Sequence, residues 1–166
     1  MDIISKSIWT EKDFETMGWH DCKVHALGSG EEGHEVVMDL DYLCQWVPPQ
    51  EDAFYSFWIA PATLVFQNVH DLSINLGEPL GLGIQDIKRT PLGPPFNKDF
   101  IGRDLEYQWL LDFLSGDISF KAVGYVQYLR SPPVFCKEKQ WLSLQERGGI
   151  SFVRAGYSLN DKTDCP

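Results

Sequence analysis

The chain has 166 residues and a formal net charge of −10 at pH 7, because 24 acidic residues outnumber 14 basic ones. Such a surface repels phosphate backbones and anionic lipid, which argues against nucleic acid and membrane surfaces as partners. The acidity either serves solubility alone or steers a basic protein partner toward the chain. Hydrophobic residues make up 43% of the chain and aromatic residues 13%, so the composition excludes a disordered chain and the length predicts a single domain over residues 1–166.

The sequence predicts a cytoplasmic protein with reduced cysteines. Apolar residues near the start come only as two separated pairs, Ile3-Ile4 and Ile8-Trp9, so there is no signal-peptide core. No stretch approaches the ~18 apolar residues that a membrane helix needs. The four cysteines form no CxxC pair and have no regular spacing, which is typical of free thiols in a reducing compartment.

The first part of the chain predicts a short helix and a β-hairpin. A capping threonine, acids in the first turn and apolar residues on one edge favour a helix over Thr10–Met17. The alternating segment Cys22–Leu27 and the longer segment Val36–Trp46, in which every second residue is apolar, are both predicted strands. The glycine-rich loop between them indicates that they pair.

The stretch Phe54–Leu76 is the densest apolar segment and the predicted centre of the fold. Its first half is apolar on both faces, which is the pattern of a strand covered on both sides. Pro61 lies within this run and cannot donate to a ladder, so we expect a bulge, a bend or an edge there. Beyond a turn, Leu72, Ile74 and Leu76 alternate with polar residues and predict a one-sided strand.

The second half of the chain predicts a further hairpin. Ile84–Arg89 reads as a brief edge strand, and Thr90–Ile101, rich in proline, as the most loop-like segment. Leu105–Phe113 and Ile118–Val126 alternate apolar with polar residues on either side of the three-residue segment Ser115–Asp117. A short loop with a central glycine between two alternating runs is a strong hairpin signal.

The end of the chain predicts only minor elements. We expect a short helix over Trp141–Arg147, then a docking strand, and a frayed tail over Asn160–Pro166. Two hairpins that flank a central hydrophobic strand, with few helical patterns, indicate the fold class. The sequence predicts a mainly β protein, an antiparallel β-sandwich or curled sheet with one or two short helices.

Trp19-His20-Asp21-Cys22, followed by His25, is the one local cluster of metal-ligand or catalytic residue types. On an extended chain His20 and Cys22 share one face while Asp21 and His25 share the other, so local geometry brings no three of them together. A metal or Cys-His site would need help from more distant histidines or cysteines. We therefore expect a structural or binding role for Trp19, His20 and Asp21 at a helix-to-strand junction.

Asp39 and Asp41 lie on one face of a predicted strand, about 7 Å apart. Paired carboxylates can perform acid–base chemistry or hold a cation, but the sequence positions no histidine or third acid beside them. Two acids on the outer side of an amphipathic strand usually form its solvated face. We therefore expect both to be exposed.

Gly28-x-Gly30-x-x-Gly33 matches the dinucleotide-binding fingerprint as a string and follows a predicted strand. The helix that should follow is missing, and Glu31 and Glu32 place negative charge where a phosphate would lie. No GxSxG, HExxH, P-loop or EF-hand string is present. The sequence therefore predicts no catalytic residue, no metal and no cofactor.

Four short motifs carry a resemblance to known proteins. They are Trp19–Cys22, Asp39–Tyr42, Ala60–Val69 and Gly116–Ala122. Their layout resembles a group of small uncharacterised bacterial proteins, and it is more distantly similar to immunity proteins of bacterial toxin systems, which carry a (W/F)HD start and a late IxFxA strand. The resemblance covers broken pieces of residues 19–128. It implies a cytoplasmic β-rich protein without enzymatic activity that neutralises a toxin.

Two hypotheses from different classes follow. We favour a non-catalytic protein-binding module, in its specific form an immunity-type inhibitor of a basic toxin, with Trp19, His20, Asp21, Asp39 and Asp41 as binding residues. The alternative is a small metal-dependent hydrolase or ligand-binding enzyme that uses the His20 and Asp21 region. The identity of the partner and the oligomeric state stay open at this point.

Overall fold

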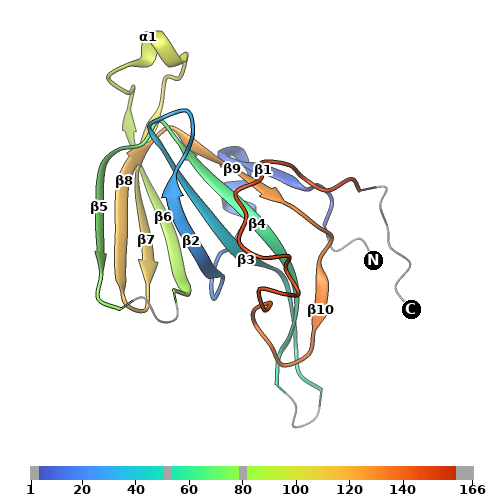
Figure 1. Ribbon diagram of the computed structural model, residues 1–166. Helices are drawn as coiled ribbons and strands as arrows, with labels where there is room; N and C mark the ends of the chain where they lie inside the picture. The colour runs from blue at the N-terminus through green and yellow to red at the C-terminus, as the bar shows by residue number, and fades with distance from the viewer. Residues whose placement is uncertain (1–3, 51–53, 79–81, 160–166) are drawn as a thin grey trace.

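The computed structural model describes residues 4–50, 54–78 and 82–159 (Figure 1). In these residues ten strands and two short helices form the secondary structure. In chain order they are β1 (Ile8–Thr10), the 3-10 helix η1 (Glu11–Thr16), β2 (Lys23–Ser29), β3 (Glu35–Val47), β4 (Ser56–Gln67), β5 (His70–Leu76), β6 (Ile84–Gly93), α1 (Lys98–Ile101), β7 (Glu106–Phe113), β8 (Gly116–Ala122), β9 (Gly124–Leu129) and β10 (Val134–Cys136).

The strands form two antiparallel sheets. Sheet A has the strand order β1-β9-β4-β3-β2, and β10 extends it by pairing with the first part of β4. Sheet B has the order β5-β8-β7-β6. The predicted fold class, a mainly β antiparallel arrangement with one or two short helices, is confirmed.

The two sheets enclose one apolar core. Phe66 of β4 lies at its centre, with its ring centroid 5.1 Å from that of Trp109 in β7 and 4.8 Å from that of Phe120 in β8. Trp109 is completely buried, and its indole N–H donates to the carbonyl oxygen of Ala122. Edge-to-face aromatic contacts with a satisfied polar group fix the relative position of the sheets as well as burying apolar surface.

The two predicted hairpins and the first predicted helix form largely as expected. β2 pairs with β3, and β7 pairs with β8, so both hairpins are present. The helix predicted after Thr10 is η1, which begins with a capping box between Thr10 and Asp13. The segment Gly28–Gly33 ends β2 and turns directly toward β3, so no helix follows the fingerprint string.

Pro61 does not interrupt β4, so a bulge or bend there is wrong, but the residue does lie at a local edge of the strand, which was one of the predicted alternatives. β4 runs unbroken between β3 and β9. The carbonyl oxygen of Pro61 accepts a hydrogen bond from the amide of Arg130, so its nitrogen faces the same side of the strand. On that side β9 ends at Leu129 and β10 begins only at Val134. Because the nitrogen faces this gap, the proline removes no ladder bond.

Two predicted boundaries and one predicted helix are also wrong. The first residues of the predicted loop Thr90–Ile101 belong to β6, and its last four form α1. The predicted run Ile118–Val126 is two strands, since β8 ends at Ala122 in sheet B and β9 begins at Gly124 in sheet A. The predicted helix Trp141–Arg147 is a series of turns. The alternation stops over the apolar run Ala122–Val126, and the core-facing positions change from Phe120 and Ala122 in β8 to Tyr125 and Leu129 in β9.

The two outer faces of the sandwich differ. Residues 137–157 cross the outer face of sheet A, the face turned away from sheet B (Figure 1). No described segment covers the outer face of sheet B, whose outward side chains include the exposed Ser73, Asn75 and Lys88. One face is therefore covered by the chain itself, and the described residues leave the other open.

The cysteines of the described residues are free thiols, namely Cys22, Cys44 and Cys136. Cys165 and the predicted frayed tail Asn160–Pro166 lie outside the described residues. Neither described helix has the length and apolar character needed to cross a membrane.

Candidate functional site

Asp39 and Asp41 lie on the outer face of β3 with both side chains completely buried. The predicted alternation is correct, because Met38 and Leu40 point into the core between the sheets. The predicted solvated face is wrong, because residues 137–157 cover it. The two acids are surrounded by basic side chains, and the group is hereafter the carboxylate–arginine cluster: Asp39, Asp41, His25, Arg130 and Arg147.

Arg147 joins the two carboxylates. Two of its nitrogens each donate to one oxygen of Asp39 at 2.6 Å, and its Nε donates to Asp41 at 3.0 Å. The side chain is fully buried, and its remaining hydrogens reach the carbonyl oxygens of Leu40 and Gly149. Every guanidinium nitrogen has an acceptor, which is the condition under which a buried arginine is tolerated.

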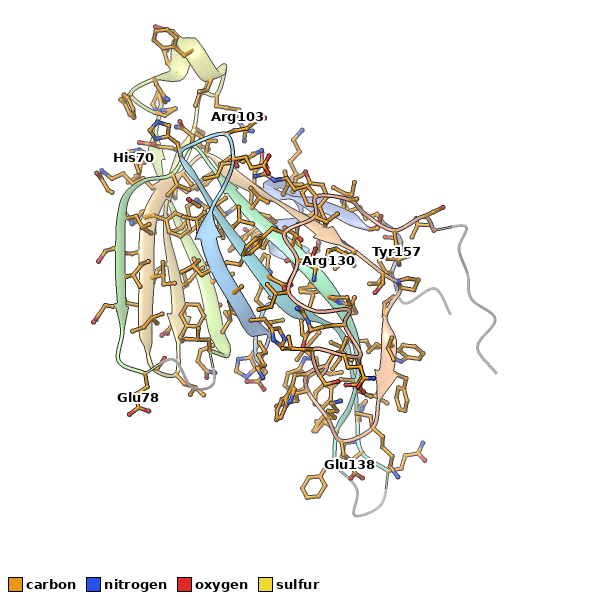
Figure 2. The ribbon with its side chains drawn as sticks, viewed as in Figure 1. His70, Glu78, Arg103, Arg130, Glu138 and Tyr157 are labelled. Carbon is orange, nitrogen blue, oxygen red and sulfur yellow. The ribbon has the colours of Figure 1, made fainter. Side chains whose placement is uncertain are left out.

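Arg130, just after β9, extends the cluster across sheet A toward the C-terminal segment (Figure 2). One nitrogen donates to Asp39 at 2.7 Å, and another donates to the hydroxyl of Thr63 and to the carbonyl oxygen of Ser151. The amide of Ser151 donates to Asp39 as well. Thr63 in turn donates to the carbonyl oxygen of Val153. These bonds fasten the C-terminal segment to β3, β4 and β9.

Asp41 holds the beginning of the same segment. One of its oxygens accepts from the amide of Leu142 and contacts Nε2 of His25, each at 2.8 Å. His25 lies at a β-bulge of β2, where the register with β3 shifts between Val24 and Ala26. The extra residue of the bulge turns the imidazole onto the same face as the carboxylate.

The cluster favours ionised groups. Burial raises the pKa of Asp39, but the hydrogen bonds from Arg147 and Arg130 outweigh it and hold that pKa below its ordinary value of 3.8. Burial also opposes the charged form of Arg147, and the neighbouring Asp39 and Asp41 outweigh it, so the pKa of Arg147 is raised. Each charge therefore depends on its partner inside the fold.

The geometry of the cluster is that of a structural latch. Four hydrogen bonds reach Asp39 and three reach Asp41, so the carboxylates are occupied by the chain itself. Among the residues that the structure describes, no group of three or more His, Cys, Asp or Glu is arranged to hold a metal ion. We assign Asp39 and Asp41 to holding the C-terminal segment in place.

Trp19 and His20 point in different directions. Trp19 is buried, and its indole N–H donates to the side-chain oxygen of Gln127 at 2.8 Å. His20 is exposed, with its Nδ1 2.9 Å from the carbonyl oxygen of Gln85 and its ring stacked on Trp46 at 5.9 Å between centroids. Of the two, only His20 can meet a partner.

Asp21 lies in a turn at a positive φ of 63° and accepts a hydrogen bond from Gln140. Its carboxylate is 3.8 Å from Nε2 of His20. His25 belongs to the carboxylate–arginine cluster, and His34 lies in the turn between β2 and β3. The four residues His20, Asp21, His25 and His34 therefore occupy three separate places rather than one site.

Arg130 and Arg147 are the residues of the cluster that the sequence analysis missed. One signal was available, because Val37 and Leu43 share a strand face with Asp39 and Asp41. Apolar neighbours on a supposedly solvated face indicate that the face is covered, and a covered acid needs a buried cation. Nothing in the sequence, however, indicates which of the 14 basic residues supplies it.

A second set of carboxylates lies on the open face of sheet B. Asp86, Asp112 and Asp117 are direct cross-strand partners on β6, β7 and β8, and they are hereafter the acidic row. The Cβ atoms of such partners lie about 4.5–5.5 Å apart, so like charges there destabilise a sheet. Among the described residues only Asp86 has a basic partner, the exposed Lys88 at 3.6 Å. The acidic row is thus largely without internal counter-charge.

Comparisons with family models, with curated proteins and with solved structures find no match to this chain. A fold class by itself does not identify an activity. The function is therefore inferred from the residues described above, and the resemblance to immunity proteins stays a prediction.

Loss of Arg147 is expected to destabilise the protein strongly. Arg147→Ala leaves Asp39 and Asp41 buried without their shared counter-charge, which costs about 3–5 kcal/mol of the free energy of unfolding. Urea denaturation measures this difference. The matched control is Lys139→Ala, which removes an exposed ion pair with Glu146 on the same segment and leaves the free energy unchanged. Equal effects of the two variants would contradict the latch.

Acid is expected to release the latch. Because the pKa of Asp39 is lower in the folded chain than its ordinary value of 3.8, its stabilisation is fully present above that value and is lost as the pH falls through the folded value. The free energy of unfolding, measured from neutral pH downward, should fall less steeply in Asp39→Asn, which cannot titrate there. Parallel profiles for the two proteins would show that Asp39 does not carry the effect.

Proposed function

We propose that this protein is a non-catalytic binding module for a basic protein partner, which it contacts through the outer face of sheet B. The observation that carries the proposal is the acidic row, three carboxylates aligned across neighbouring strands on a face that no described segment covers. Folding alone disfavours this arrangement, because opposed like charges destabilise a sheet. Lysine or arginine side chains of a partner would relieve that repulsion.

The contrast between the two sheets supports the proposal. In sheet A, Asp39 and Asp41 are neutralised by arginines of the same chain. In sheet B, Asp112 and Asp117 have no basic partner among the described residues, although both are partly buried. The net charge of −10 also steers a basic protein toward the surface, most strongly at low ionic strength.

The specific form that we propose is an immunity-type inhibitor that neutralises a basic toxin in the cytoplasm. It is supported by the (W/F)HD-type start at Trp19–Asp21 and by the acidic charge. The free thiols Cys22, Cys44 and Cys136 suit a reducing compartment. Such an inhibitor needs no catalytic group, because a complex that covers the partner's active site is sufficient.

Neutralising two carboxylates of the acidic row is expected to weaken binding and to stabilise the free protein. The probe is a fluorescein-labelled decalysine peptide, followed by fluorescence anisotropy at about 0.1 M salt, where the Debye length is about 10 Å. The dissociation constant for decalysine should be about tenfold higher in the double variant Asp112→Asn/Asp117→Asn than in the wild-type protein. The free energy of unfolding rises by ~0.5 kcal/mol, because the repulsion between opposed acids is removed.

The matched control removes the same charge from the other end of sheet B. The helix α1 lies beyond that end of the sheet (Figure 1). Asp99 lies in α1 and Asp104 shortly after it, and both are exposed. Asp99→Asn/Asp104→Asn is expected to change the affinity for decalysine by less than about twofold, since exposed charges at a distance are screened. Equal weakening by the two double variants would mean that binding follows net charge alone, and the acidic row would lose its role.

Co-expression tests the immunity-type form separately. Bacteria that produce the protein encoded next to this gene are expected to stop growing and to recover when this chain is produced with it. Asp112→Asn/Asp117→Asn, at the same soluble level, should rescue growth poorly, because the central contacts of an interface carry most of its binding energy. A harmless neighbour, or equal rescue by both chains, would contradict the immunity-type form.

A further inference from the structure

β5 is an edge strand of sheet B and leaves part of its backbone without a partner (Figure 1). The amide of Gly77 donates to the carbonyl oxygen of Ser115 at 2.8 Å, in line with the register of β5 and β8. Hydrogen-bonded positions alternate along an antiparallel pair. The backbone N–H and C=O groups of Asn75 and Gly77 therefore point toward β8, and those of Ile74 and Leu76 point away from the sheet. No hydrogen bond to the outward groups occurs among the described residues.

The free edge carries apolar side chains beside a groove. Leu72 is 48% exposed and Ile74 is 51% exposed. Ile74 is the cross-strand partner of the buried Ile118, so its side chain faces the core side of sheet B at the rim of the sandwich. A groove of about 260 Å³ separates β5 from the β2–β3 hairpin, and its apolar lining is formed by Leu72, Ile74, Leu27 and Val36.

This edge lacks the usual protection against pairing. Edge strands are normally guarded by lysine, by proline or by a short length. Residues 72–76 contain no lysine and no proline, and they carry no charge. The single charged residue of β5, Asp71, lies at the irregular start of the strand and pairs with Lys121 of β8. A free, uncharged and apolar edge beside a groove is the combination that binding by strand addition uses.

The acidic row leads to the same edge. Asn75 of β5 is the cross-strand partner of Asp117, so a strand added outside β5 would place an outward residue in line with the acidic row. The residues of that strand on either side would face the groove, because side chains alternate between the faces. The structure thus fixes the pattern of a suitable strand, with apolar residues toward the groove and basic residues toward the acids.

We propose that the basic partner is bound by strand addition to β5. An extended partner segment pairs with the outward backbone groups of Ile74 and Leu76, places an apolar side chain at every second position in the groove, and presents lysine or arginine between them. The inference rests on the proposed function and adds the mode of binding. A second copy of this chain does not fit this edge, because each copy carries a charge of −10 and pairing would bring two acidic rows together.

The test compares two fluorescein-labelled peptides by anisotropy, decalysine and a decapeptide of alternating lysine and valine. The wild-type protein should bind the alternating peptide about tenfold more tightly. Two further versions of the lysine–valine peptide carry methyl groups on the backbone nitrogens of every second residue, one version on the valines and the other on the lysines. One version should bind about tenfold more weakly and the other almost unchanged, because only one of the two sets of N–H groups faces β5.

Two variants of one residue separate backbone from side chain. Ile74→Ala shortens the side chain and keeps the N–H, while Ile74→Pro also removes the N–H. That N–H points outward, so proline is compatible with the edge strand and the thermal midpoint should stay close to that of Ile74→Ala. The alternating peptide should bind Ile74→Pro about tenfold more weakly than Ile74→Ala. If Ile74→Pro does not fold, the two methylated peptides decide the question.

The outcomes distinguish this inference from the proposed function. Equal binding of the two methylated peptides, equal affinities of folded Ile74→Pro and Ile74→Ala, or no preference for the alternating peptide over decalysine would overturn strand addition. If decalysine binding still depends on the acidic row in that case, the proposed function stands and only the mode of binding fails. If decalysine binding does not depend on the acidic row, the proposed function itself fails.

Discussion

The fork that Arg147 forms between Asp39 and Asp41 is the interaction on which the outer layer of the protein depends. Residues 137–157 form no strand in sheet A, so side chains and isolated backbone groups must hold them there. Arg130 anchors the later part of the segment through Ser151. Replacement of a buried ion pair by apolar residues can be neutral for stability. The contribution of the Arg147–aspartate pairs here is to select one position of residues 137–157, because the buried donors find acceptors only when the segment lies in that position.

Two sets of carboxylates, one on the outer face of each sheet, differ in this respect. Asp39 and Asp41 of sheet A are satisfied by the fold and cannot contact another molecule without opening it. Those of the acidic row lie on a face that the described chain leaves open, next to the uncharged edge of β5. The proposed partner supplies what this half of the molecule lacks, namely positive charge for the row and a strand for the edge. The two features lie together because Asn75 continues the line of Asp117.

Much of the fold could be predicted from period-2 alternation. β3, β7 and β8 alternate clearly, since each has one face on the core, and their hairpin partners follow from short turns. The sheet change at Val123 is marked in the sequence only by the break in alternation over Ala122–Val126, and such a break does not by itself indicate that the chain crosses to the other sheet. The burial of Asp39 and Asp41 could have been inferred from Val37 and Leu43 on the same strand face, but their pairing with Arg147, more than 100 residues away, could not. Local sequence contains no signal for so distant a pairing.

The claim that the open half of the molecule binds a basic strand is tested most directly by NMR. Amide spectra of the intact protein, recorded during titration with a basic peptide of alternating pattern, locate the contact residue by residue. The account predicts that the largest shifts and the greatest new protection from hydrogen exchange fall on Ile74, Leu76 and the neighbouring acidic row. Shifts centred on sheet A near His20 and Trp46, or spread evenly over the surface, would contradict it.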